Sequence, residues 1–116
     1  MQNTPMALKL IYRANIFVVS RSRPTLEMGR DDSNDIVVAS LSASRIHARV
    51  QARDGHFVLT DLSRNGTFLL VDGQSSEVRL RREEAVLGGR GWIGLGRSAA
   101  THGPHSVRYA LQAETA

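Results

Sequence analysis

Apolar residues occur along this chain in short runs, and turn-forming residues separate one run from the next. Ile46, Ala48 and Val50 alternate with polar residues, a period of two that is typical of a strand with one buried face. We therefore expect strands within residues 7–13, 15–20, 25–28, 36–38, 46–50, 56–60, 67–71, 78–80, 86–87, 92–95 and 107–111.

The intervals between these runs predict an all-β fold. Asp54-Gly55 lies between two of the runs and predicts a two-residue hairpin turn. The best helical candidate covers residues 79–85, but this segment is short and has no cap. About ten strands at a spacing of about 8–12 residues indicate a β-sandwich or a barrel.

Length and composition indicate one globular domain. The chain has 116 residues, of which 41% are hydrophobic and 22% are charged. We expect a flexible segment at residues 1–6, the domain at residues 7–112 and a tail at residues 113–116. No apolar run approaches the roughly 20 residues that span a bilayer, and no signal-peptide pattern is visible. We expect a cytoplasmic protein without membrane contact.

The charged residues narrow the chemistry further. Basic residues number 15 against 11 acidic ones, and Lys9 is the only lysine. Such an excess of arginine suggests nucleic-acid binding, but the arginines are scattered among acidic neighbours and aromatic residues make up only 5%. We expect no nucleic-acid partner. The planar arginine fork also binds a carboxylate or phosphate through two hydrogen bonds, which leaves open which anion these arginines bind.

Glycines and histidines near the C-terminus indicate no cofactor or metal. Residues 89–94 fit the pattern G-x-G-x-x-G, but no helix follows them to meet a dinucleotide, so we interpret these glycines as tight turns between strands. His102 and His105 have no carboxylate or cysteine nearby, and the chain contains no cysteine. We expect a surface loop there and no metal.

Ser44, His47 and Asp61 supply the residue types of a hydrolase triad. Residues three apart on a strand point to opposite faces, however, and the Gly-x-Ser-x-Gly turn that exposes a nucleophile is missing. We therefore expect no enzymatic activity.

Three separated segments share a position where a loop meets a strand. They cover residues 29–35, 42–48 and 61–68. Each has an ordinary interpretation when taken alone, such as a simple turn at Asn65-Gly66 or a partly buried histidine at His47. Their joint occurrence in this order and spacing is much harder to attribute to chance.

Taken together, these segments resemble the forkhead-associated (FHA) domain family from about residue 10 to residue 111. The family pattern is Gly-Arg, then Ser-Arg-x-His, then Asn-Gly-Thr shortly after Asp-Leu. The matching residues are Gly29, Arg30, Ser44, Arg45, His47, Asn65, Gly66 and Thr67. The resemblance implies an eleven-stranded β-sandwich whose recognition loops lie at one end. It also implies a module that binds phosphothreonine peptides and catalyses no reaction.

The resemblance implies a role for each candidate ligand-binding residue. Ser44 is expected to donate a hydrogen bond to the phosphate, Arg45 to form an ion pair with it, and Arg30 to hold the phosphate or the peptide backbone. Asn65 is expected to hold the peptide main chain just past the phosphothreonine, and Arg64 to add a contact. A phosphate carries about −1.5 to −2 charges at neutral pH, and guanidinium and hydroxyl groups are suitable donors for it.

Four more matching residues are expected to support this site. The resemblance implies that the ring of His47 braces the loops that carry the ligand-binding groups. Gly29 and Gly66 are expected to meet backbone requirements rather than to contact the peptide. Thr67 is placed in the same supporting group.

The implied partner is a protein that carries phosphothreonine, the substrate of a Ser/Thr kinase, bound by a monomeric domain. The long segment 74–91 looks like the version of the family found in bacterial signalling proteins, some of which join this domain to a class III adenylate cyclase. We interpret the arginines and glutamates at residues 79–84 as a solvated, self-neutralising face. The alternative function is a phosphate-independent interaction or oligomerisation domain that regulates a fused or partner adenylate cyclase.

Overall fold

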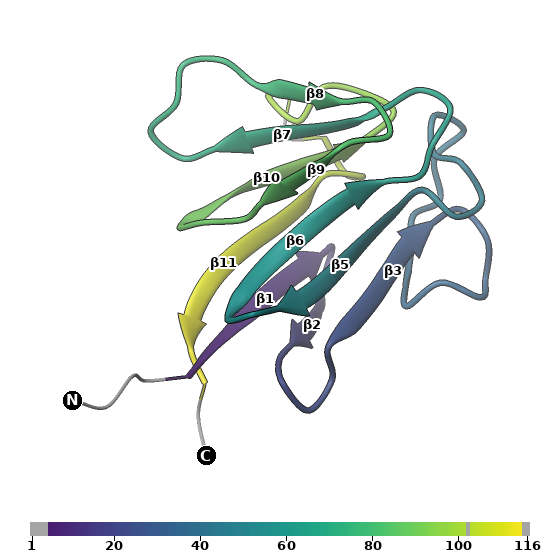
Figure 1. Cartoon of the computed structure of the whole chain (residues 1–116). Coiled ribbons are helices and arrows are strands. Elements are labelled where there is room, and N and C mark those ends of the chain that lie inside the picture. The colour runs from purple at the N-terminus through teal and green to yellow at the C-terminus, as the bar shows by residue number, and fades with distance from the viewer. Residues whose placement is uncertain (1–4, 102, 115–116) are drawn as a thin grey trace.

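Two β-sheets pack against each other in a computed structural model that describes residues 5–101 and 103–114 (Figure 1). The six-stranded sheet contains, in spatial order, β2 (Asn15–Val19), β1 (Met6–Tyr12), β11 (Val107–Ala113), β10 (Arg90–Leu95), β7 (Thr67–Val71) and β8 (Val78–Leu80). The five-stranded sheet contains β4 (Ile36–Val37), β3 (Thr25–Gly29), β5 (Ala48–Arg53), β6 (His56–Asp61) and β9 (Glu84–Val86). This arrangement confirms the predicted all-β sandwich.

Alternating side chains fill the space between the two sheets. On β1, Leu8, Leu10 and Tyr12 are buried while Lys9 and Ile11 between them are partly exposed. Burial of one such leucine side chain contributes about 1.5–3 kcal/mol. Both sheets supply the core, with Leu8, Leu10, Val19, Leu69, Ile93, Leu95, Val107 and Tyr109 from the larger sheet and Leu26, Met28, Ile36, Val50, Phe57 and Leu59 from the smaller one.

The hairpin between β5 and β6 confirms the turn predicted at Asp54-Gly55. Asp54 has a φ of 51° and Gly55 a φ of 79°, the left-handed conformations of a two-residue hairpin turn. Such a turn sets the register of both strands, and it places Ala48 opposite Asp61 at the far end of the hairpin. Two of the motif-bearing loops therefore start side by side.

The weak helical candidate at residues 79–85 forms no helix, in line with the expected all-β fold. This segment forms β8, a bend and β9, and the two strands belong to different sheets. Arg82 has a φ of 57° at the bend, a conformation that an α-helix excludes. The bend carries the chain from one sheet to the other.

The interpretation of residues 89–94 as tight turns is wrong for two of the glycines. Gly91 and Gly94 lie within β10. A Cβ at Gly91 would collide with the Leu70 carbonyl, and a Cβ at Gly94 would collide with the Arg97 carbonyl. Gly91 allows close approach of the neighbouring strand, and Gly94 allows close approach of the loop that follows β10.

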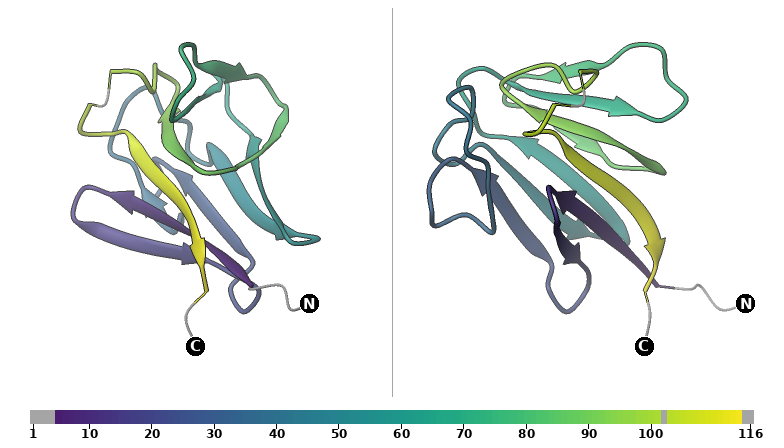
Figure 2. Two further views of the ribbon diagram at one scale, coloured as in Figure 1. Left: turned by 90° about the vertical axis from the view of Figure 1, so that its left-hand side faces the viewer. Right: turned by 180° about the vertical axis from the view of Figure 1, so that it is seen from behind.

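The loops at one end of the sandwich lie opposite both chain ends. The connections from β3 to β5 and from β6 to β7 gather at one end, whereas β1 begins and β11 finishes at the other (Figures 1 and 2). None of the residues 5–101 and 103–114 belongs to a helix able to cross a membrane.

Candidate functional site

Three loops bring the predicted site residues together. We call residues 30–35, 38–47 and 62–66 the site loops; they connect β3 to β4, β4 to β5 and β6 to β7. Ser44 lies at their junction. The backbone N–H of Arg30 donates to the Ser44 carbonyl at 2.9 Å, and the backbone N–H of Arg64 donates to the Ser44 Oγ at 3.2 Å. All three loops thus meet at one serine.

The first two site loops run against each other without room for a side chain between them. A Cβ at Gly29 would collide with the carbonyl oxygen of Arg45, so only glycine permits this approach. Asp31 N–H donates to the same Arg45 carbonyl at 3.1 Å. The buried Asn34 also donates to it through Nδ2 at 2.7 Å. Sequence reasoning missed Asn34, which lies in the first motif segment among three aspartates.

His47 joins the second and third site loops through both ring nitrogens. Its Nδ1 accepts the Ser44 N–H at 2.9 Å, and its Nε2 donates to the Gly66 carbonyl at 2.9 Å. The ring is fully buried. Burial lowers the pKa of His47 although the Gly66 carbonyl and Asp61 favour the protonated ring. The neutral imidazole therefore ties two loops together.

The same hydrogen bonds exclude a Ser44–His47 nucleophile pair. Ser44 and His47 lie in a loop rather than on a strand, so the argument from strand geometry was wrong. The ring cannot accept a proton from the Ser44 hydroxyl, because backbone groups occupy both of its nitrogens. Ser44 Oγ instead accepts from Arg64 N–H, and its own hydrogen remains able to point at a ligand.

A buried carboxylate organises the third site loop. Asp61 is 1% exposed. Its Oδ1 accepts hydrogen bonds from the Ser63 hydroxyl at 2.6 Å and the Thr67 hydroxyl at 2.7 Å, and its Oδ2 accepts from Arg82 N–H at 2.8 Å. Burial alone would raise the pKa of Asp61, but these donors outweigh it and lower the pKa below its ordinary value. The Ser63 hydroxyl in turn accepts from Gly66 N–H at 2.8 Å.

Sequence reasoning placed Thr67 in a supporting role but assigned nothing to Ser63 and set Asp61 aside as a triad component. The spacing Asp-x-Ser could have indicated their pairing, because an aspartate often accepts from the residue two positions later in a turn. The turn is completed by Gly66, whose φ of 90° favours glycine.

Three arginine side chains at this end have no partner among the residues that the structure describes. Arg30, Arg45 and Arg64 are exposed, and their guanidinium groups make no hydrogen bond or ion pair with any residue that the structure describes. Arg45 contributes only a weak charge effect that, after hydrogen bonds from Ser33, helps to lower the pKa of Asp31. The site loops therefore present cationic donors whose hydrogen bonds remain available to an anion.

Arg79 fixes the backbone beside Asn65. Its Nε and a terminal nitrogen donate to the Asn65 carbonyl at 3.1 and 2.6 Å. The same guanidinium lies 5.1 Å from the ring centre of Phe68. The side-chain amide of Asn65 is exposed and makes no hydrogen bond within residues 5–101 and 103–114.

The interpretation of residues 79–84 as a solvated, self-neutralising face is right about exposure and wrong about neutralisation, because the described charged side chains of this segment are exposed but form no ion pair with one another. Arg79 and Arg82 donate to backbone carbonyls of the third site loop, Arg82 to Ser63 at 3.0 Å. Glu84 forms its ion pair with Arg53 across the smaller sheet at 2.7 Å. Arginines were predicted in this segment as solvated charges, but the tertiary structure uses two of them to support the candidate site.

The described residues contain no cluster of three or more histidine, cysteine, aspartate and glutamate side chains that could hold a metal. His102 lies outside the described residues. His105 Nδ1 accepts a hydrogen bond from the Tyr12 hydroxyl at 2.9 Å.

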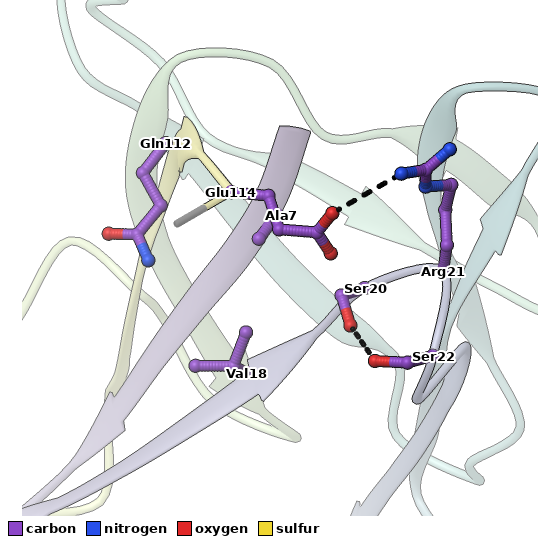
Figure 3. A pocket seen from close by; sticks show the side chains of 7 residues that line it. All are labelled: Ala7, Val18, Ser20, Arg21, Ser22, Gln112 and Glu114. Carbon is purple, nitrogen blue, oxygen red and sulfur yellow. Dashed lines mark hydrogen bonds and ion pairs between the residues drawn. The ribbon is translucent and has the colours of Figure 1, made fainter. Parts of the chain in front are cut away.

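A separate pocket lies near the chain ends, away from the site loops (Figure 3). It is lined by Ala7, Val18, Ser20, Arg21, Ser22, Gln112 and Glu114. Arg21 forms an ion pair with Glu114 at 3.6 Å, and the Ser20 and Ser22 hydroxyls are hydrogen-bonded to each other at 3.1 Å. The arginine and the two serine hydroxyls of this pocket therefore already have partners.

Comparison with known proteins relates the chain to one family. The family model of the FHA domain matches residues 26–87. The "Oxoglutarate dehydrogenase inhibitor" of Corynebacterium diphtheriae is 36% identical over 67 residues, which are 57% of this chain and 47% of that protein. The chain thus spans about half the length of this relative.

Similar folds occur in solved structures. FHA-1 of Rv1747 from Mycobacterium tuberculosis superposes with a TM-score of 0.67 at 18% identity, over 92% of this chain and 97% of that one. EmbR of Mycobacterium tuberculosis, in complex with a low affinity phosphopeptide, superposes with a TM-score of 0.68 at 23% identity, over 99% of this chain and 26% of that one.

Proposed function

Because this chain belongs to the FHA-domain family, we propose that it is a phosphothreonine-peptide-binding module for phosphorylation-dependent protein–protein interaction in signalling. FHA domains are recognition modules rather than enzymes. The observation that carries the proposal is the junction at Ser44, where three loops meet beside arginines that have no partner in the described part of the chain.

The phosphate would bind at this junction. Ser44 donates its hydroxyl hydrogen to a phosphate oxygen, and Arg45 supplies an ion pair with its free guanidinium. Arg30, whose backbone is tied to Ser44, holds the phosphate or the adjacent peptide backbone. Charge-assisted hydrogen bonds of this kind are about twice as strong as neutral ones.

The peptide main chain would continue over the third site loop. The exposed amide of Asn65 holds the main chain just past the phosphothreonine, and Arg64 adds a contact to the phosphate or main chain. Arg79 holds the Asn65 carbonyl and His47 holds the Gly66 carbonyl, so the loop is fixed before the peptide arrives. Such preorganisation reduces the entropy lost on binding.

The partner would be a phosphothreonine-bearing substrate of a Ser/Thr kinase, bound by a monomeric domain at residues 7–112 in the cytoplasm. The complex of EmbR with a phosphopeptide supports this class of ligand. Attachment to an adenylate cyclase, as in some bacterial signalling proteins, is a further part of the proposal that the full-length sequence would test.

The test is titration of a phosphothreonine peptide library against the wild type and Arg45→Ala. We expect binding that requires the phosphate, and a loss of about 1.5–3 kcal/mol in Arg45→Ala because a charge-assisted contact is removed. Arg23→Ala, an equally charged change in the turn between β2 and β3, is the matched control. Binding of unphosphorylated peptides with equal affinity, or an unchanged Arg45→Ala, contradicts the proposal.

A phosphate-independent function is favoured by one observation only. Strand β2 is an edge of the larger sheet, and Ile16 and Val18 on it are 63% and 43% exposed. An apolar edge strand can pair with another chain. A native mass that shows a dimer unaffected by phosphopeptide, with Arg30 and Ser44 dispensable, would favour oligomerisation or regulation of a fused or partner adenylate cyclase through this edge.

A further inference from the structure

The outer face of the larger sheet carries a row of mainly apolar side chains. Strand pairing aligns one outward residue from each of β2, β1, β11, β10 and β7, namely Ile16, Ile11, Arg108, Trp92 and Leu70. All five are at least partly exposed, and within the described residues no further strand or helix covers them, because every strand belongs to one of the two sheets. The water-facing side of an antiparallel sheet is normally polar. Four members of this row depart from that pattern.

The outer face of the smaller sheet is mainly polar, and its arginines have counterions. Arg49 on β5 forms an ion pair with Glu27 on β3 at 2.8 Å, and Arg53 forms one with Glu84 on β9 at 2.7 Å. The Thr60 hydroxyl also donates to Glu84, at 3.3 Å. The apolar row is therefore a property of the larger sheet and not of both sheet faces.

Two arginines lie over aromatic rings on the face of the larger sheet. The guanidinium of Arg108 is 5.0 Å from the centre of the Trp92 ring, and it donates to both carboxylate oxygens of Asp72 at 2.8 and 2.7 Å. Arg79 lies over Phe68 in the same way. A guanidinium is attracted to the face of an aromatic ring, so these side chains lie flat against the sheet. Tryptophan and arginine are among the residues that most often carry the binding energy of protein interfaces.

Basic side chains outnumber acidic ones around this row. Lys9 lies on β1 and Arg13 just after it, and neither forms an ion pair with a described residue. Arg90 and Arg108 share one carboxylate, that of Asp72, at 3.9 and 2.7 Å. Four basic groups thus lie near one acidic group, and two of the four have no counterion in the described part of the chain.

We propose that the outer face of the larger sheet binds a partner protein through a segment that presents carboxylate and apolar side chains on one surface. The carboxylates would pair with Lys9 and Arg13, and the apolar side chains would cover Ile11, Ile16 and Leu70. The contact requires no phosphate and uses no residue of the site loops, so it goes beyond the proposed function and does not depend on it. Burial of the apolar row would supply most of the affinity, and charge complementarity would supply specificity and fast association.

Two other occupants fit this face less well. A second copy docked face to face would bring the same uncompensated basic groups together, and like charges across an interface are costly. A membrane surface is bound by apolar side chains that enter the lipid, whereas Trp92 is only partly exposed beneath the guanidinium of Arg108. An acidic protein segment matches both the charge and the apolar row.

The experiment selects ligands for the full chain from a displayed library of unphosphorylated random peptides. We expect the enriched peptides to combine aspartate or glutamate with leucine, isoleucine, valine or phenylalanine. Fluorescence anisotropy then gives the Kd of the most enriched peptide and of a counterpart with lysine in place of each acidic residue. The wild type should bind the acidic peptide at least about tenfold more tightly than its lysine counterpart, because the counterpart meets like charges.

Lys9→Glu and Ile11→Ser test the face itself. Both should weaken binding of the acidic peptide about tenfold or more, the first through like-charge repulsion and the second through loss of apolar contact. Both residues lie on β1, an inner strand, so the free edge of β2 is unchanged. Arg81→Glu is the matched control, with the same change in charge on the bend between β8 and β9, and should change the Kd by less than about twofold because salt screens distant charges.

Thermal unfolding checks that each variant is folded. Lys9→Glu decides the question even if Ile11→Ser is not folded, because it breaks no ion pair with a described residue. The inference is overturned if no acidic peptide is enriched or if Lys9→Glu binds the acidic peptide as tightly as the wild type. It is equally overturned by a dimer that Lys9→Glu dissociates, or by a wild type that binds phosphatidylglycerol vesicles but no peptide.

Two of the variants separate this inference from the proposed function. Arg45→Ala should bind the acidic peptide as the wild type does, and Lys9→Glu should bind a phosphothreonine peptide as the wild type does. Failure of either proposal then leaves the other in place. A single one of these variants that loses both ligands would mean that they share one site, and this result would overturn the inference.

Discussion

The two ends of this sandwich carry similar residues, but they differ in whether the arginine and serine donors have internal partners. The pocket near the chain ends contains an arginine beside two serines, but Arg21 is paired with Glu114 and the serine hydroxyls with each other (Figure 3). At the loop end, Arg45 follows Ser44, and neither the guanidinium nor the hydroxyl hydrogen has an internal partner among the described residues. Arginine and serine side chains occur at both ends, so residue type and a hollow in the surface do not distinguish the candidate site. What distinguishes it is that its donors have no internal partner among the described residues and lie on a rigid backbone.

Asp61 holds the third site loop in place, and its contribution to stability can be measured. Replacement of Asp61 by alanine leaves the buried hydroxyls of Ser63 and Thr67 and the partly buried backbone N–H of Arg82 without their acceptor. Unpaired buried donors cost about 1–3 kcal/mol each, so we expect the free energy of unfolding to fall by about 3–5 kcal/mol. Urea denaturation measures this loss. Glu114→Ala is the comparison at the other end, where an exposed ion pair is worth about 0–1 kcal/mol. Similar losses in the two variants would refute the contrast.

The free cations of the loop end predict the next largest effect. Arg30→Ala should weaken phosphothreonine-peptide binding by about 1.5–3 kcal/mol, because it removes a charge-assisted contact. Arg21→Ala removes the same charge from the other end and should leave the Kd unchanged. Calorimetric titration of both variants with one peptide decides the matter, and equal weakening would show that net charge rather than position governs binding.

Acid should loosen the loop end through His47. Burial lowers its pKa, so the folded protein resists the proton that the unfolded chain accepts near its ordinary pKa of about 6.5. The stability due to the neutral ring is complete above that pH and declines as the pH falls below it. Denaturation without peptide at a series of pH values measures how steeply the free energy of unfolding changes with pH. His47→Gln should flatten the dependence of the unfolding free energy on pH. Because the pKa of His105 is lowered as well, by burial and then by Arg13 and Arg97, His105→Gln measures the part of that dependence that comes from the connection between β10 and β11. A slope that persists in His47→Gln assigns the effect elsewhere.

The smallest expected effect tests whether an arginine that loses its ion-pair partner becomes a phosphate-binding group without further change. Glu114→Gln removes the ion-pair partner of Arg21 but builds no loop junction around it. We expect the affinity for a phosphothreonine peptide to change by less than about twofold, since an exposed, mobile arginine gains little from one contact. Nuclear magnetic resonance shifts would show where the peptide binds. A new phosphate site around Ser20 and Ser22 would mean that preorganisation matters less than we propose.

Much of the fold follows from local patterns. Alternation along residues 46–50 and the Asp54-Gly55 turn predicted the β5–β6 hairpin, because period-two burial and left-handed turn residues act over short range. The same reasoning left residues 79–85 as a weak helical candidate, because a short apolar and charged segment can satisfy either period; the segment forms parts of two strands and a bend. The left-handed bend at Arg82 is stabilised by Asp61, 21 residues earlier in the chain, and no local pattern encodes that contact.

The motif residues, and hence the family, could be found in the sequence alone. Gly29 and Gly66 are required by close backbone approaches, and His47 joins two loops through both ring nitrogens. Their individual roles at the candidate site remain predictions. Only the tertiary structure decided which of the fourteen arginines are free. An arginine is long and flexible, and whether it meets a carboxylate, a carbonyl or solvent depends on strands that pair across the whole chain. That is why Arg21 and Arg45 look equivalent in the sequence, whereas in the fold Arg21 forms an ion pair and Arg45 has no partner among the described residues.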